Sequence, residues 1–263
     1  MVNDLRQVVI YAGPEAPDGE WLATASGCPV LRRPRELAAV ADRDRPLLVV
    51  PASTGRDLTS ITHAAQGLQW LRSQGFAVCL AEAVANDTYT IARLRHHLRA
   101  LDAGGAVGAL VVAHEVNPFA DAELLRRVRL AQQFSRHNLV EVAFEGPGGW
   151  PDVDRATDRL VALGAERIVH IRGDLGGGSA SEATPLFSAQ GLRRAVELAA
   201  ERGLRLWEST GDDGIALGLL ADHGQGFAHS HGEEEQHSHG HSHTHSHSHG
   251  HSHPHHHSYP HTH

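Results

Sequence analysis

The sequence predicts an α/β protein with two lobes, each a parallel β-sheet flanked by helices, followed by a disordered C-terminal tail. Short continuous runs of apolar and β-branched residues alternate with longer stretches of helical periodicity. Such an alternation is typical of parallel strands that are covered on both faces. The roughly 228 residues before the tail are also enough to bury a substantial core.

The predicted strands are continuous apolar runs that end in small or polar residues. Because both faces of such a strand are covered, it needs no alternation of polar and apolar residues. In chain order these strands cover residues 8–12, 47–50, 77–81, 109–113, 140–144, 167–171 and 204–207.

The predicted helices lie between these strands and carry start and stop signals. Pro151 and Asp152 predict the beginning of one helix and Gly164 its end, while Gly203 predicts the end of another. In chain order the helices cover residues 35–41, 58–73, 88–101, 120–135, 152–163 and 189–201.

The order of these elements repeats along the chain, which predicts the domain division. Residues 1–103 and 106–222 each begin with a short strand and later pass through an apolar strand followed by a loop that contains glycine. The small and polar residues 102–105 predict a linker between the two lobes, and residues 223–263 form the predicted tail.

Charge and cysteine usage exclude several functional classes. The formal net charge is -8 and no stripe of Lys or Arg occurs, which argues against nucleic acid or an anionic membrane as the partner. Two distant cysteines, Cys28 and Cys79, make neither a disulfide framework nor a CxxC site, and Cys79 is expected to be a buried thiol. With no apolar span, no signal-peptide core and no Walker loop, we expect a cytoplasmic protein that binds no nucleotide.

The tail carries the clearest chemical signal. Sixteen histidines lie between His229 and His263, mostly alternating with Ser, Gly or Thr, so this segment cannot form an apolar core. Neutral imidazole binds Ni²⁺, Co²⁺, Zn²⁺ and Cu²⁺, which predicts metal storage or delivery with poor selectivity. An engineered tag is the alternative. The predicted ligands are His229, His231, His237, His239, His241, His243, His245, His247, His249, His251 and His253.

Two segments resemble the sirohydrochlorin chelatase family. The strand and loop at 109–118, Ala-Leu-Val-Val-Ala-His-Glu-Val-Asn-Pro, is similar to the family's first strand, which ends in a histidine loop before a helix. Residues 140–145 and 154–169 resemble a later strand with an acidic residue and a helix that ends in Leu-x-x-x-Gly-Ala-x-Arg-Ile-Val. The resemblance covers residues 8–222 in outline and is specific over 109–171.

This resemblance implies an ATP-independent insertion of Co²⁺, Ni²⁺ or Fe²⁺ into a tetrapyrrole, in a cleft between two lobes. Such enzymes serve cobalamin, siroheme and related porphyrin-type biosynthesis. The family's second metal-site histidine, expected after the Arg-Ile-Val strand, is missing here, because residues 171–179 contain no histidine. Either another ligand replaces it or catalysis has been lost.

His114 and Glu115 are the predicted catalytic residues, with His114 also a metal ligand. An imidazole binds borderline metals and accepts protons near neutral pH, and a neighbouring carboxylate orients it or relays protons. The pair follows a parallel strand, where open α/β sheets place their ligands. A loop histidine that caps the next helix is the alternative interpretation.

The other candidates lie in loops and on one helix. Arg56 and Arg172 occupy comparable loops of the two halves, and with Ser53 they are the predicted binding residues for substrate carboxylates. A pair of surface arginines is the alternative. His63 is a further predicted metal ligand, although a solvated helix surface also explains it. The glycine-rich loop at 176–179 is predicted to move over a bound ring or to offer it backbone N–H groups.

The sequence therefore predicts a sirohydrochlorin-type metallochelatase, with Co²⁺ favoured, whose tail concentrates the metal. A tetrapyrrole and divalent metal ions are its predicted ligands, and the metal is substrate or cargo. Insertion of nickel into another tetrapyrrole is an alternative that the same sequence features predict equally. The alternative from a different class is a metal storage or chaperone protein on a chelatase-like scaffold that no longer inserts metal. The oligomeric state is not specified by the sequence.

Overall fold

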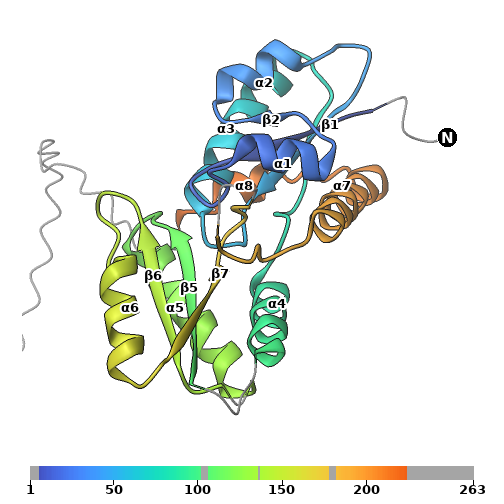
Figure 1. Ribbon diagram of the computed structural model, residues 1–263. Helices are drawn as coiled ribbons and strands as arrows, with labels where there is room; N and C mark the ends of the chain where they lie inside the picture. The colour runs from blue at the N-terminus through green and yellow to red at the C-terminus, as the bar shows by residue number, and fades with distance from the viewer. Residues whose placement is uncertain (1–5, 102–105, 136, 178–181, 224–263) are drawn as a thin grey trace, which may run out of the picture. The chain divides into compact units, whose positions relative to one another are not determined.

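A computed structural model describes residues 6–101, 106–135, 137–177 and 182–223 of the chain. These residues contain two parallel sheets flanked by helices, which confirms the predicted α/β class with two lobes (Figure 1). The predicted tail histidines from His229 onward lie outside the described residues. No helix in the described part of the chain is long and apolar enough to cross a membrane.

The first sheet has the strand order β2-β1-β3-β4, with every pair parallel. Its third strand, with the sequence Leu-Leu-Val-Val-Pro-Ala, is buried along its whole length, as expected of a strand covered on both faces. The strands are β1 (Gln7–Ala12), β2 (Val30–Leu31), β3 (Leu47–Ala52) and β4 (Val78–Leu80).

Among the described residues, the second sheet repeats this order with one strand fewer. Its order is β6-β5-β7, again parallel throughout. In both sheets the first strand has the second on one side of it and the third on the other, which supports the predicted repeat. The strands are β5 (Val107–His114), β6 (Val140–Glu145) and β7 (Arg167–Arg172).

Side-chain caps fix where most of the helices begin. Asp57, Asn86, Asn117, Asp152 and Ser188 each accept a hydrogen bond from a backbone N–H of the first turn that follows. The helices are α1 (Gly19–Ser26), α2 (Pro34–Val40), α3 (Leu58–Ser73), α4 (Asp87–Ala100), α5 (Pro118–Gln133), α6 (Val153–Ala162), α7 (Ala189–Thr210) and α8 (Ile215–Leu219).

The predicted strand over 204–207 is wrong, because these residues belong to α7. Gly203 does not end the helix but lies inside it, against the first sheet. A Cβ at this position would lie 3.0 Å from both Cα and Cβ of Ala81, so the missing side chain lets the helix approach the end of β4. The glycine therefore serves packing here.

The helices do not follow the division of the two sheets. α7 packs against β3, β4 and α1, and α8 packs against α3, so the end of the described chain covers the first sheet (Figure 1). α4 packs against α5 in turn. Residues 102–105, the predicted linker, lie outside the described residues. α7 and α8, placed in the 106–222 lobe by the prediction, pack around the first sheet.

Candidate functional site

The candidate site lies where the strands of the second sheet end. His114 is the last residue of β5, Glu145 the last of β6 and Arg172 the last of β7. Since the strands are parallel, their carboxyl ends meet at one edge, and His114 is the register partner of Glu145. Asp174 follows two residues after Arg172 and completes the group.

The buried carboxylate of Asp174 holds this group together. It accepts hydrogen bonds from the backbone N–H of His114 (2.8 Å) and of Gly176 (2.9 Å). Arg172 donates to it through Nε (2.9 Å) and Nη2 (2.6 Å). Burial alone would raise its pKa, but the hydrogen bonds from His114 and Arg172 and the guanidinium charge lower the pKa of Asp174 to about 2. Asp174 and Arg172 therefore form an ion pair at neutral pH.

The Nδ1 atom of the His114 imidazole contacts both a cation and an anion. Arg172 Nη2 lies 2.8 Å from its Nδ1, and Asp174 Oδ2 lies 3.2 Å from the same atom. A guanidinium only donates, so Nδ1 accepts from Arg172 when the ring proton is on Nε2. When Nδ1 carries the proton and donates to Asp174, Nε2 has a free lone pair for an ion or a proton. About a third of the side chain is exposed (34%).

Glu115 directly follows β5, and its side chain lies against the loop after β6. Its backbone N–H donates to the carbonyl of Glu145 (2.9 Å). A Cβ on Gly146 would lie 2.6 Å from Glu115 Oε1, and one on Gly148 would lie 2.8 Å from Oε2, so both glycines leave room for this carboxylate. Gly146 also has a φ of +131°, which favours glycine.

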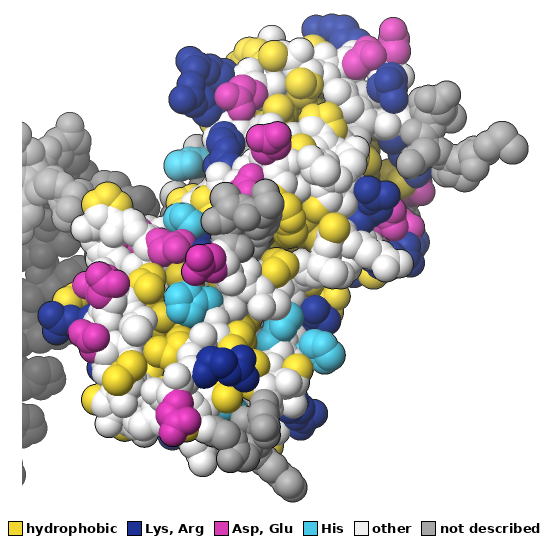
Figure 2. All heavy atoms as spheres, viewed as in Figure 1, with side chains coloured by type: hydrophobic (Ala, Val, Ile, Leu, Met, Phe, Trp, Pro, Cys, Tyr) yellow, Lys and Arg dark blue, Asp and Glu magenta, His cyan; other side chains and the backbone are white. Residues whose placement is uncertain are grey.

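A cavity of about 620 Å³ lies beside Glu115. Its lining combines the carboxylates of Glu115 and Asp121 with apolar side chains that include Leu125, Phe144 and Trp150. Trp150 is exposed and has the guanidinium of Arg155 over its ring, 4.1 Å from the centroid. Figure 2 shows histidine and acidic side chains next to one another on the face in view. The carboxylates of Asp174 and Glu145 lie at the His114 imidazole, and this cavity beside Glu115 adds apolar side chains.

The first sheet ends in a second buried ion pair, between Glu15 and Arg56. The Glu15 side chain is fully buried and accepts from Arg56 Nε at 3.0 Å. Ser53 donates its hydroxyl to Glu15 (2.5 Å), Thr54 donates its backbone N–H (2.9 Å) and its hydroxyl, and Asp57 donates its backbone N–H (3.2 Å). One carboxylate thus fixes the whole loop after β3.

Arg56 also connects this loop to His114. Its Nη2 donates to the backbone carbonyl of His114 (2.7 Å), and its Nη1 donates to Asp121 Oδ1 (2.8 Å). In addition, Leu175 donates its backbone N–H to the carbonyl of Glu15 (2.7 Å). The ends of both sheets are therefore linked by hydrogen bonds, and Arg56 positions the backbone that carries the imidazole.

The geometry corrects the prediction for three residues. Ser53, Arg56 and Arg172 are almost fully buried and point at carboxylates of this chain. Because these carboxylates already neutralise the guanidinium groups, binding of substrate carboxylates by these residues is not supported by the structure. The alternative of surface arginines is wrong as well, since both have a structural role in the interior.

Among the described residues, the other predicted ligand, His63, is not brought together with His114. His63 is exposed on α3, as the alternative interpretation expected. Half of the glycine-rich loop at 176–179 lies outside the described residues. Over the described ranges, no three His, Cys, Asp or Glu side chains are arranged to hold a metal ion as they stand. Cys79 is a buried free thiol, and burial raises its pKa to about 12.

Sequence reasoning missed Glu15 and Asp174, and it noted Glu145 only as the acidic residue of a strand within the resemblance. Glu15, Glu145 and Asp174 all lie at or shortly after the ends of strands that the sequence did predict. A carboxylate at the end of a buried strand was the available signal. Its significance depends on which strands are neighbours, and the sequence does not give the strand order.

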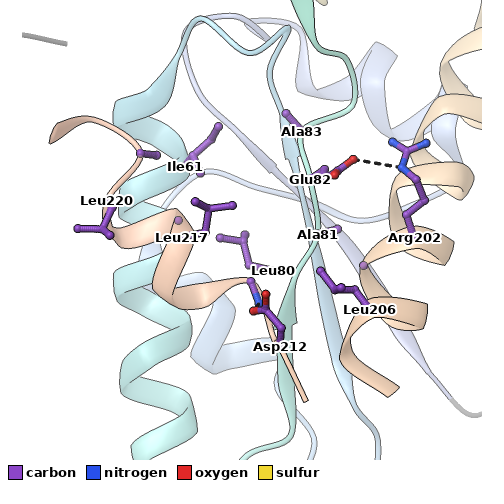
Figure 3. A pocket seen from close by; sticks show the side chains of 14 residues that line it. Ile61, Leu80, Ala81, Glu82, Ala83, Arg202, Leu206, Asp212, Leu217 and Leu220 are labelled. Carbon is purple, nitrogen blue, oxygen red and sulfur yellow. Dashed lines mark hydrogen bonds and ion pairs between the residues drawn. The ribbon is translucent and has the colours of Figure 1, made fainter. Parts of the chain in front are cut away.

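A further cavity lies at the end of β4, between α3, α7 and α8 (Figure 3). It measures about 460 Å³ and is lined mainly by apolar side chains, including Leu80, Leu206 and Leu217. Glu82 and Arg202 form an ion pair at 3.1 Å on its lining. Of the predicted catalytic and metal-binding residues that the structure describes, none lines this cavity.

Comparison with known proteins gives no family for this chain. No protein-family model matches it, and no curated protein sequence matches it. Function is therefore inferred from the residues at the ends of the two sheets and from the histidines of the tail.

Proposed function

We propose that this protein inserts a divalent metal ion, with Co²⁺ favoured, into a sirohydrochlorin-type tetrapyrrole without ATP. The observation that carries the proposal is the partly exposed imidazole of His114 at the end of a parallel sheet, with carboxylates around it. Insertion replaces two pyrrole protons of the ring by the ion, so the site must accept protons as well as hold a cation. Imidazole and carboxylate are suited to both tasks.

The roles of the residues follow from their contacts. His114 acts as ligand or base through Nε2 in the tautomer that donates from Nδ1 to Asp174, and a carboxylate partner of this kind fixes the ring. Glu145 Oε2, 3.4 Å from Nδ1, and Glu115 are the neighbouring proton acceptors. The apolar surface that includes Trp150 and Leu125 suits a flat ring, and the C-terminal histidines raise the local metal supply.

Exchange of His114 for alanine tests this assignment. Incubation with sirohydrochlorin and Co²⁺ is followed by the change of the tetrapyrrole absorption. The His114→Ala variant should insert metal on the order of 100-fold more slowly, the usual effect of losing a general base. His96→Ala is the matched control, because His96 is exposed on α4 and should leave the rate unchanged. An unchanged rate in His114→Ala would exclude this residue.

Metal storage or delivery is the second candidate, and one observation favours it. Arg56 and Arg172 are directed at carboxylates of the protein, so the site presents little positive charge to a ring with many carboxylates. Tetrapyrrole binding, measured by the absorption of the ring, separates the candidates, because a metal store needs no ring. Binding of several Co²⁺ equivalents without any effect of sirohydrochlorin would favour storage.

A further inference from the structure

The guanidinium of Arg172 lies among three side chains of the kind that bind transition metals. Nη2 lies 2.6 Å from Asp174 Oδ2 and 2.8 Å from His114 Nδ1, and Nη1 lies 2.7 Å from Glu145 Oε2. The guanidinium is almost fully buried, and Asp174 is completely buried. A cation therefore already contacts these three atoms, and Nδ1 accepts from it in the tautomer that carries the ring proton on Nε2.

Two distances between these three atoms match the spacing of metal ligands. His114 Nδ1 lies 3.2 Å from Asp174 Oδ2 and 3.4 Å from Glu145 Oε2. Tetrahedral metal ions with bonds of about 2.0–2.2 Å have ligand atoms about 3.3 Å apart. One imidazole and two carboxylates are also a suitable donor set for Zn²⁺ or Co²⁺. The guanidinium occupies the position where such an ion would bind, which is why the three side chains hold no metal as they stand.

We propose that the guanidinium of Arg172 occupies a latent binding site for a divalent transition metal and thereby blocks it. A guanidinium keeps its charge at every physiological pH, so it stays bound to these carboxylates. The consequence for metal transfer depends on the function proposed above. A site with three ligands retains an ion, whereas His114 alone binds it weakly enough to pass it on.

Thermal unfolding of the full-length chain with and without Co²⁺ tests this inference. Arg172→Met removes the cation, and Arg172→Gln does so while keeping a hydrogen-bond donor for Asp174. Both variants should be stabilised by Co²⁺, with Tm rising by roughly 5–10 °C at a concentration 100-fold above the Kd of the new site. Wild type should not show this rise, and the C-terminal histidines are the same in every variant.

Three further variants act as controls. Arg172→Lys keeps a positive charge and should behave like wild type, and so should Arg159→Met, which removes an exposed arginine. The double variant Arg172→Met/Asp174→Asn should lose the gain. A new visible absorption of tetrahedral Co²⁺ should accompany the gain in Arg172→Met.

Two results would overturn the inference. One is an equal effect of Co²⁺ on wild type and on both Arg172 variants. The other is that the Met and Gln variants stay unfolded even with Co²⁺, since the ion should replace the missing charge. Insertion by wild type without a gain in Arg172→Met would refute this inference and leave the proposed function intact. A gain in Tm by Arg172→Met, together with no metal insertion by wild type, would support this inference and refute the proposed function.

Discussion

Removal of the Arg56 guanidinium should destabilise the fold strongly, although the side chain lies in a loop. Arg56→Met leaves the carboxylate of Glu15 buried without its counter-charge. Breaking a buried ion pair on one side typically lowers the free energy of unfolding by about 3–5 kcal/mol. Four other donors to Glu15 remain, from Ser53, Thr54 and Asp57, so we expect the lower end, about 3 kcal/mol.

Urea and thermal unfolding of the full-length chain measure this effect. For a folded region of this size, a loss of about 3 kcal/mol lowers Tm by roughly 6–12 °C. Arg159→Met is the matched control, because the Arg159 side chain is 59% exposed and its ion pair with Glu141 lies at the surface. The control should change the free energy of unfolding by less than about 0.5 kcal/mol.

A double-mutant cycle separates the ion pair from other effects of the substitution. Glu15→Gln removes the charge of the carboxylate, so Arg56→Met should be less damaging in that background, by about 1 kcal/mol or more. Equal effects of Arg56→Met in both backgrounds would refute the ion pair as the cause. A loss no larger than that of Arg159→Met would show that Arg56 does not stabilise the fold at all.

Two further predictions concern Asp174 and Gly203. Asp174 has a folded-state pKa of about 2, below the ordinary value, so its ionised form contributes stability above about pH 5 that is lost as pH falls toward 2. Urea unfolding of Asp174→Asn should show about 2–3 kcal/mol less of this acid dependence than wild type, and equal dependence would contradict the prediction. Gly203→Ala should lower the free energy of unfolding by about 1 kcal/mol despite alanine's higher helix propensity, because the new Cβ meets Ala81. A stabilised variant would show that α7 moves away from β4.

The described strands other than the two-residue β2 were predictable, because continuous apolar runs that end in small or polar residues are typical of buried parallel strands. The error at 204–207 shows where this rule fails. Leu204, Leu206 and Trp207 form a short apolar run, but buried Leu192, Ala195, Val196, Ala199 and Ala200 continue at helical spacing into Gly203. Helix α1 was missed because it is short and lies between glycine and proline residues.

The candidate site was predictable in part, because His114 and Arg172 end strands that the sequence identifies. Their partners were not predictable. Asp174 contacts His114 across 60 residues of sequence, and Glu145 contacts Arg172 across 27, so these contacts depend on the order β6-β5-β7. The sequence suggested that Arg172 binds a ligand, and only the partners show that its charge is already neutralised.

The two halves of the repeat contain the same kind of buried ion pair, with a different role in each half. Each sheet ends in a buried carboxylate paired with an arginine from the end of its third strand or the loop after it, Glu15 with Arg56 and Asp174 with Arg172. In the first half this pair is sealed from solvent and holds the loop after β3. In the second half it contacts an imidazole that is 34% exposed. Because Arg56 also holds the carbonyl of His114, the first half provides a rigid support for the residue on which the proposed chemistry depends. A loss of the ion pair between Glu15 and Arg56 should therefore impair the site at His114 as well as the stability of the fold.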